Sequence, residues 1–258
     1  MIVMATRPNK LKPQKSMQNL YRLAVRLWNG DGIPKSYKRG FRAALEAAQL
    51  GHVKAQVMVG AAYDYGVGVR KNPKLAFRYY RRAALAGDVD AQYDVGACYA
   101  EGVGVRANIR AAVGWLTLAA KHGVPDALQE LGYNYRYGVG VKRNLKRGFR
   151  LHMTAARHGL ARAQFSVGFC YSRGEGVKAD PTKAFRWYQL AARRGHPEAA
   201  YNVAYYYETG RGVRRNPGRA LKWYNVAAKL GDEEAGSALR RLKRVAFRSA
   251  AATKGSAE

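Results

Sequence analysis

Two cysteines and five histidines are the side chains of this chain best suited to nucleophilic, redox or metal chemistry. Cys98 and Cys170 do not form a Cys-x-x-Cys pair, and the sequence contains no His-Glu-x-x-His motif and no histidine cluster. Structural and catalytic metal sites need ligands at such close spacing. We therefore expect no metal site and no cofactor.

Four histidines fall at or beside the predicted end of a helix, where the helix dipole and free carbonyl groups explain them. They are His52, His122, His158 and His196. His152 differs, because it stands where the related segments described below carry Tyr80, Tyr188 and Tyr224. A core histidine with one hydrogen bond is the favoured interpretation of His152, and a catalytic base is the alternative.

Gly-Val-Gly-Val segments resemble phosphate-binding loops, but their context argues against nucleotide binding. No Lys-Ser or Lys-Thr follows a glycine at P-loop spacing. None of the seven serines begins a Ser-x-x-Lys motif, so the nucleophile signature of serine β-lactamases is missing as well. We expect these segments to be turns and the protein not to be an enzyme.

The glycine segments recur because the whole chain is a repeat with a period of 36 residues. Counting from the opening alanine, glycine occupies positions 12, 14 and 33, valine position 15, and an Ala-Ala pair positions 29 and 30 in all five full copies. A less regular copy begins at Asn19. The opening alanines are Ala55, Ala91, Ala127, Ala163, Ala199 and Ala235.

Each repeat is predicted to form two short helices. Ala55, Val59 and Tyr63 lie one turn apart on one face of a first helix, which the glycine pair ends. Asn-Pro or Asp-Pro pairs then supply an N-cap and a first-turn proline for a second helix. Neither helix can bury its apolar stripe alone, so stability must come from stacking. The predicted fold class is all-α, an α/α superhelical solenoid of about six helix-turn-helix repeats.

The pattern A-x-x-x-L/V-G-x-x-Y-x-x-G-x-G-V…A-F-x-W-Y-x-x-A-A-x-x-G resembles the Sel1-like repeat, a relative of the tetratricopeptide repeat. Residues 163–198 hold the clearest copy, with Gly168, Tyr171, Trp187 and Tyr188 in their expected places. The resemblance covers roughly residues 19–248. It implies a superhelix that binds partner proteins, while the identity of a partner does not follow from the fold.

Some cysteine-rich members of this family bind or hydrolyse β-lactams, which makes an enzyme an alternative to consider. Those members carry a cysteine pair in every repeat, whereas this chain has two cysteines in all. Cys98 and Cys170 both sit at position 8, two repeats apart. On helix stacking distances they should lie roughly 20 Å apart, too far for a disulfide. We expect reduced, half-buried thiols and a reducing compartment.

The repeat predicts one elongated domain over residues 16–249. Residues 1–15 form a basic N-terminal segment and residues 250–258 a tail, and both lack the pattern and are expected to be disordered. The repeats are 19–54, 55–90, 91–126, 127–162, 163–198 and 199–234, followed by a capping helix over 235–249 with Leu239, Leu242 and Ala246 directed inward.

The face of the first helices away from the core varies between copies and is aromatic and locally acidic. In related superhelical repeats the first helices line the concave side, so we predict a concave groove that holds a protein or peptide partner. The alternative is that the rings only pack between adjacent first helices. The predicted partner-binding residues are Tyr65, Tyr93, Asp94, Glu101, Glu130, Tyr133, Tyr137, Phe169, Tyr205 and Glu208, on a face that also includes Asp64, Arg136, Phe165, Arg173, Tyr201 and Asn202.

The net charge of +29 and a pI near 10.4 favour acidic partners. Cations at positions 20, 24, 28 and 31 of the second helix form an outer ridge, and position 16 adds a ladder after each loop. Backbone-directed RNA or DNA binding by this ridge is the alternative function, and a merely solvated basic face is the simpler explanation. The ridge residues are Arg78, Arg150, Arg186, Lys222, Arg240 and Arg244.

These observations favour a non-enzymatic scaffold or adaptor that binds another protein, with no small-molecule substrate and no membrane insertion. The N-terminus has no long apolar run, so neither a secretory signal peptide nor a transmembrane helix is expected. A cytoplasmic location is predicted. Import into an organelle is the alternative, because residues 1–30 hold six cations and no acid.

Overall fold

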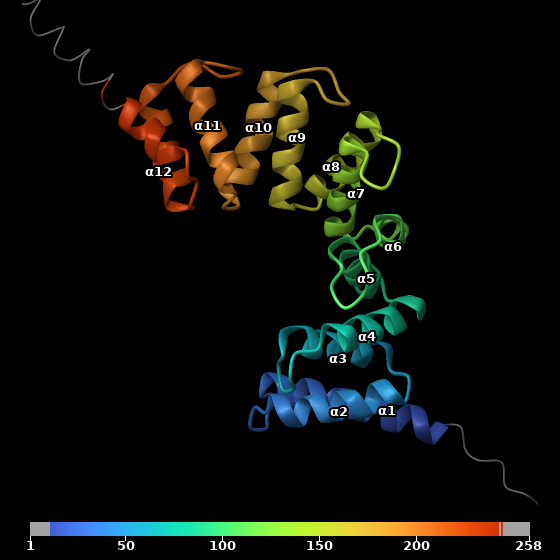
Figure 1. Cartoon of the computed structure of the whole chain (residues 1–258). Coiled ribbons are helices and arrows are strands. Elements are labelled where there is room, and N and C mark those ends of the chain that lie inside the picture. The colour runs from blue at the N-terminus through green and yellow to red at the C-terminus, as the bar shows by residue number, and fades with distance from the viewer. Residues whose placement is uncertain (1–10, 243, 245–258) are drawn as a thin grey trace, which may run out of the picture. The chain divides into compact units, whose positions relative to one another are not determined.

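The computed structural model describes residues 11–242 and residue 244, and every regular element in that part of the chain is an α-helix. The chain divides into two units at Val124 and Pro125. The helices of the first unit are α1 (Leu11–Asn29), α2 (Tyr37–Gln49), α3 (Val53–Tyr65), α4 (Pro73–Leu85), α5 (Val89–Glu101) and α6 (Ile109–Lys121) (Figure 1). Those of the second are α7 (Pro125–Tyr137), α8 (Leu145–Arg157), α9 (Ala161–Arg173), α10 (Pro181–Arg193), α11 (Pro197–Thr209) and α12 (Pro217–Lys229).

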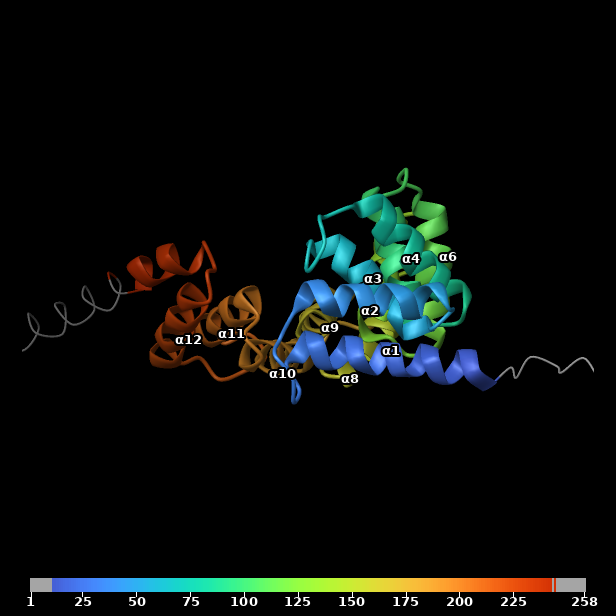
Figure 2. The same cartoon turned by 90° about the horizontal axis from the view of Figure 1, so that it is seen from below.

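Each unit is a stack of helix pairs. In the first unit α1 packs on α2, α3 on α4 and α5 on α6, and the pairs meet where α2 contacts α3 and α4 contacts α5. Helices α1 and α2 run side by side in both views (Figures 1 and 2). In the second unit α7 packs on α8, α9 on α10 and α11 on α12, with α8 against α9 and α10 against α11. The all-helical fold of six paired repeats is therefore confirmed.

Short polar side chains start the second helix of every repeat, and in three repeats a proline follows the cap, as the Asn-Pro and Asp-Pro pairs predict. The side chain of Asn72 accepts a hydrogen bond from the backbone N–H of Leu75 at 3.1 Å, which satisfies one of the free donors at the start of α4. Equivalent caps are made by Ser36, Asn108, Asn144, Asp180 and Asn216. The first helix ends at Gly66 in the left-handed conformation (φ +73°), which glycine adopts without a Cβ clash.

The predicted apolar stripes form the core. Ala55 and Val59 of α3 are fully buried, and α4 buries the set of second-helix positions expected from the sequence. In three repeats the ring at position 26 lies against a glycine at position 6, so a Cβ on Gly60 would stand 2.7 Å from the ring of Tyr80. The buried residues of α4 are Ala76, Phe77, Tyr80, Ala83 and Ala84.

The ends of the chain differ in part from the predicted boundaries. Helix α1 begins at Leu11, so residues 11–15 are helical, although they were expected from the sequence to be disordered. A helix can begin before the first repeat motif, because the motif reflects core contacts and does not mark where the helix starts. Residues 1–10 lie outside the described part of the chain.

The predicted capping helix begins at residue 235 as expected. It is helical over residues 235–242, with Ala235, Ala238 and Leu242 buried against the last repeat and Leu239 packed partly against it. Residue 243 and residues 245–258, including Ala246 and the predicted tail, lie outside the described residues.

Within each unit, a glycine at position 14 joins a repeat to the one before it. A Cβ on Gly176 would collide with the carbonyl of Leu145, the first residue of α8, and Gly104 is placed in the same way against Pro73, the first residue of α4. The loop therefore packs backbone against backbone. A left-handed φ and this close approach together explain why no other residue type occurs at position 14.

Gly176→Ala and Gly174→Ala form a matched pair that separates these two requirements. The two glycines have nearly equal φ values, +73° and +75°, but a Cβ on Gly174 meets only ordinary contacts at 3.5 Å. We expect Gly174→Ala to cost about 1 kcal/mol of unfolding free energy for the left-handed conformation. Gly176→Ala should cost at least about 2 kcal/mol more, because backbone must move. Equal losses in urea denaturation would show that the joint is not close-packed.

Candidate functional site

The first helices of successive repeats lie beside one another within each unit and form one face there. In the first unit, the Nζ atom of Lys54 on α3 lies 2.9 Å from a carboxylate oxygen of Asp88 and 3.3 Å from one of Asp90, at the start of α5. In the second unit, Arg162 on α9 lies 2.8 Å from Asp126 on α7. Ion pairs therefore join the first helices of neighbouring repeats within each unit.

The face of α3 and α5 is acidic. Burial, then Asp90 and Asp64, raise the pKa of the half-buried carboxyl of Asp94 to about 6. Glu101 is exposed at the end of α5. Tyr65 is 76% exposed and stands at the edge of this face. A cationic ligand would lower the cost of keeping these carboxylates charged together.

The two thiols are unsuited to nucleophilic chemistry at neutral pH. Burial, together with the carboxylate of Asp64, raises the pKa of half-buried Cys98 to about 11. Burial also raises the pKa of Cys170 to about 11. A thiolate is the reactive form of cysteine, and both groups hold their protons. Both are free thiols, although Cys170 is fully buried and not half-buried as expected.

The face of α7 and α9 is aromatic, and arginines cover its rings. The rings of Tyr133 and Tyr137 lie 4.5 Å apart. The guanidinium of Arg136 lies 4.2 Å from the ring centre of Phe169 and 4.9 Å from that of Tyr137, and it also pairs with Glu175 at 2.6 Å. With a side chain only 12% exposed, Arg136 organises the rings.

A groove of about 410 Å³ opens between α9 and α11. Its wall is mostly aromatic, and Arg173 and Arg211 provide its cationic groups. Ser172 accepts a hydrogen bond from the hydroxyl of Tyr206 at 3.0 Å, which holds one wall in place. The lining consists of Phe165, Phe169, Ser172, Arg173, Tyr188, Tyr201, Asn202, Tyr205, Tyr206 and Arg211.

A second hollow of about 680 Å³ shares four lining residues with the α9–α11 groove and continues it toward the start of the capping helix. Its far end is acidic, and that end includes Glu198, Asp232, Glu233 and Glu234. Asp232 accepts hydrogen bonds from the backbone N–H groups of Glu234 and Ala235, so it also caps the last helix. The shared residues are Phe169, Arg173, Tyr201 and Asn202.

The predicted partner-binding residues differ in their solvent exposure. Five are exposed, namely Tyr65, Glu101, Tyr133, Tyr137 and Tyr205, and five are half-buried, namely Tyr93, Asp94, Glu130, Phe169 and Glu208. Glu130 lies 3.6 Å from Arg162 in an ion pair. Packing between helices, the alternative weighed from the sequence, applies to Phe165, whose ring stacks on His196 at 4.6 Å, and to Tyr201, whose ring lies 5.2 Å from that of Tyr224.

Sequence analysis missed the groups that the loops and the next repeat bring to the groove. Arg211 follows the first glycine of its loop, and its side chain returns to donate a hydrogen bond to the backbone carbonyl of Ser172 at 2.8 Å. Glu233 and Glu234 precede the capping helix. The only sequence signal for these groups was the cluster of acidic residues after Gly231, which lies outside the helical periodicity of the repeats.

The predicted basic ridge is exposed throughout. Arg78, Arg150, Arg186 and Lys222 occupy equivalent places on α4, α8, α10 and α12, and Arg240 and Arg244 follow on the last helix. None of these six takes part in an ion pair within the described residues. Binding of RNA or DNA by this ridge stays a prediction.

Two histidines stand at the start of a first helix, and not at the end of a second helix as the sequence indicated. His52 precedes α3, and its Nδ1 accepts a hydrogen bond from the N–H of Ala55 at 3.2 Å. His196 takes the same place before α11. The turn between helices is so short that one residue can be assigned to either neighbour. His122 and His158 do end α6 and α8, as expected.

A metal site requires grouped ligand side chains, and a membrane span requires a long apolar helix. No group of three or more histidine, cysteine, aspartate or glutamate side chains in this part of the chain is arranged to hold a metal ion. None of the described helices is both long enough and apolar enough to cross a membrane.

Comparison with protein families identifies the repeat. The Sel1 repeat model matches six consecutive segments, residues 20–52, 53–88, 89–124, 125–160, 161–196 and 197–232. The chain belongs to the Sel1 repeat family. Each segment from the second to the sixth starts at the first residue of an odd-numbered helix, for example Val53 of α3. The family boundaries therefore lie two residues before the alanines used above, with the same period.

Solved Sel1 repeat structures have the same fold. A Sel1 repeat protein from Oxalobacter formigenes is 32% identical with a TM-score of 0.78, covering 85% of this chain and 86% of that one. A protective antigen present in uropathogenic Escherichia coli strains is 30% identical with a TM-score of 0.82 over 89% of this chain. The chain spans about half of that antigen, 49% of its length. A comparison with curated proteins finds no match.

His152 fills the tyrosine place of the fourth Sel1 repeat and is 1% exposed. Its Nδ1–H donates to the Oε1 atom of Gln129 at 2.7 Å, and Nε2 has no hydrogen-bond partner. The interpretation as a core histidine is favoured by this burial. Burial, with Arg136 as the second cause, lowers the pKa of His152 from 6.5 to about 4.

This Sel1 protein should lose stability in mild acid through His152. Because the folded pKa lies below the unfolded value, the unfolded chain binds the proton first, and stability falls between pH 6.5 and about 4. Between pH 7 and pH 5 we expect a loss of about 2 kcal/mol from this group. His152→Tyr, which restores the repeat pattern over Gly132, should remove that part of the loss in urea denaturation. His52, His196 and Asp94 remain in both proteins, so the difference isolates His152.

Glu208 holds the last Sel1 repeat together and is not free for a ligand. Its carboxylate accepts a hydrogen bond from the buried Tyr224 hydroxyl at 2.7 Å and pairs with Arg241 at 2.7 Å, while its own side chain is 19% exposed. Glu208→Ala should cost about 2 kcal/mol of unfolding free energy, because the tyrosine hydroxyl loses its acceptor. The matched change Glu101→Ala should stay within about 0.5 kcal/mol. Equal effects would contradict this division of roles.

Proposed function

We propose that this Sel1 repeat protein is a non-enzymatic scaffold that binds a segment of another protein along its first helices. The α9–α11 groove carries the proposal, because it combines aromatic walls with a few fixed polar groups. Aromatic side chains and arginine dominate the binding energy of protein interfaces, and they lose little conformational freedom on binding. A fold of stacked helix pairs presents such a face without any catalytic group.

The charge along the groove indicates the chemistry of the ligand. Phe169 and Tyr205 offer apolar contact in the middle, whereas Glu198, Glu233 and Glu234 form the acidic end. A peptide with an apolar or aromatic anchor followed by a lysine or arginine would match both parts. An acidic end is unusual in a chain with 46 cations and 17 acids, and it would exclude an acidic ligand from that end.

The acidic face of α3 and α5 supports the same kind of ligand in the first unit. Asp64, Asp90, Asp94 and Glu101 gather there, and Lys54 is the cation that pairs with this group. The exposed ring of Tyr65 lies at its edge. Both units therefore offer aromatic contact beside carboxylates, although the loops and the second helices are basic.

A selection from a random peptide library displayed on phage tests the proposal on the purified protein. The selected peptides should share an apolar anchor and a nearby cation. The double change Phe169→Ala and Tyr205→Ala should weaken their binding at least about tenfold, since each removes an anchor. The matched control, Leu190→Ala with Val226→Ala, removes exposed apolar side chains from α10 and α12 and should bind as the parent does.

Charge reversal at the acidic end provides the second arm. Glu233 is exposed, so Glu233→Lys should leave the circular dichroism spectrum unchanged while weakening peptides that carry the cation. Peptides that bind both variants as tightly as the parent would contradict the proposal, as would a library that yields no enriched sequence.

A further inference from the structure

A basic groove in the first unit lies outside the face proposed for protein binding. It has a volume of about 950 Å³ and runs between the start of α4 and the loop before α6. Four of its lining side chains are cations, namely Arg70, Lys71, Lys74 and Arg106, and none is an acid. We call these four residues and the hollow between them the α4 groove.

The cations of the α4 groove have no internal role. None of the four takes part in an ion pair or a side-chain hydrogen bond within the described residues, whereas Arg136, Arg162 and Arg241 are all paired with acids. The side chain of Asn72 caps the start of α4, and the formal positive charge of the groove is carried by the four side chains. Unpaired cations make the local electrostatic potential more positive, and they repel one another.

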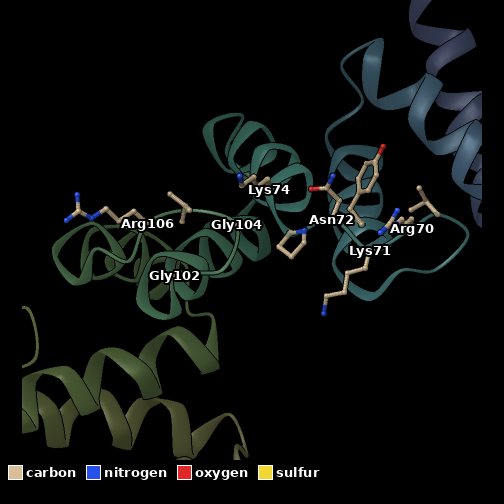
Figure 3. Close-up of a pocket in the computed structure, with 11 residues that line it drawn as sticks. Arg70, Lys71, Asn72, Lys74, Gly102, Gly104 and Arg106 are labelled. Carbon is tan, nitrogen blue, oxygen red and sulfur yellow. The ribbon is translucent and has the colours of Figure 1, made fainter.

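The four charged ends do not converge on one point. Figure 3 shows the side chains of Arg70, Lys71, Lys74 and Arg106 around the groove with their ends directed apart. A single phosphate or sulfate ion would need convergent donors. An extended polyanion, which carries a charge at every unit of its chain, fits a groove with spaced cations better.

The neighbouring surface of α4 continues the same chemistry. A hollow of about 370 Å³ is lined by Leu75, Arg78, Tyr79 and Arg82, again without an acid. The rings of Tyr79 and Tyr63 stack at 6.0 Å, and Tyr63 lines the α4 groove. Cations interleaved with aromatic rings are the pattern that binds single strands, because rings offer stacking to any base.

The joint between repeats reproduces the cation set elsewhere. The α4 groove lies where Gly104 packs on Pro73, and its cations occupy positions 16, 17 and 20 and position 16 of the next repeat. The joint where Gly176 packs on Leu145 carries cations at the same four positions: Lys142, Arg143, Lys146 and Lys178. Cations retained at one structural place favour a specific role over a general excess of charge.

We propose that the α4 groove binds the phosphodiester backbone of a single-stranded nucleic acid. The four cations contact phosphates, and the surface with Arg78, Tyr79 and Arg82 extends the path of the strand. Recognition is directed at the backbone, so no base sequence is preferred. This site is separate from the aromatic α9–α11 groove, and it places the nucleic acid on the loops and α4 and not on the ridge of all second helices.

Fluorescence anisotropy with a labelled oligouridine, titrated with the full chain at several salt concentrations, tests the assignment. Changing Arg70, Lys71, Lys74 and Arg106 together to glutamine should weaken binding at least about tenfold. It should also make the slope of log affinity against log salt shallower by about 0.7 for each phosphate that the variant no longer neutralises. The control changes Arg186, Arg193, Lys222 and Lys229 of α10 and α12 to glutamine, which removes the same charge and should weaken binding less than about threefold.

Three results would overturn the assignment. Equal losses in the two variants would mean that net charge alone attracts the strand, and a larger loss in the control would move the site to the second helices. Competition by polyglutamate at the same charge concentration as oligouridine would point to an acidic protein instead. Circular dichroism spectra and melting temperatures of both variants must match those of the parent. We expect this match because all the substituted positions are exposed.

Discussion

The close contact between a glycine and the backbone of the preceding repeat is the constraint on which the rest of each unit depends. Gly104 and Gly176 pack on the carbonyl of the first residue of a second helix, where a side chain of any size would intrude. This contact sets how closely one helix pair can follow the next. It thereby decides that Lys54 reaches Asp90 and that Tyr206 reaches Ser172, so the faces proposed to bind ligands are consequences of the joint.

Position 26 shows how one framework accepts different chemistry. Tyr80, His152 and Tyr188 lie on a position 6 glycine at nearly the same distance, yet their polar ends have different partners. Tyr224 donates to Glu208, and His152 donates to Gln129, which in turn donates to Ser166 at 3.0 Å. The steric fit at the glycine is the same for Tyr80, His152 and Tyr188, while the hydrogen bonds of position 26 side chains vary. Most buried polar groups need a local partner, so these two repeats have different hydrogen-bond networks.

The charges of the protein are sorted by structure. Most pairs that involve acids join first helices to one another or to their loops, as Arg162 with Asp126 and Arg136 with Glu175 do. The cations of the loops and second helices have few such partners. Most acids therefore pair along the first helices, and unpaired cations remain on the loops and second helices, so the surfaces proposed for a peptide and for a polyanion differ in charge.

The sequence by itself determined the period, the helix pairs, their caps and the core, because these depend on contacts between residues at fixed spacing. Asn72 as a cap, Gly66 as a helix end and Ala83 in the core follow from local chemistry. Only the tertiary structure decided which members of a predicted face remain available. Glu208 falls on the same helical face as Tyr205, but Arg241 and the hydroxyl of Tyr224 reach its carboxylate from other elements. Long side chains such as that of Arg241 contact residues of other elements, and the residue spacing along one helix does not predict those contacts.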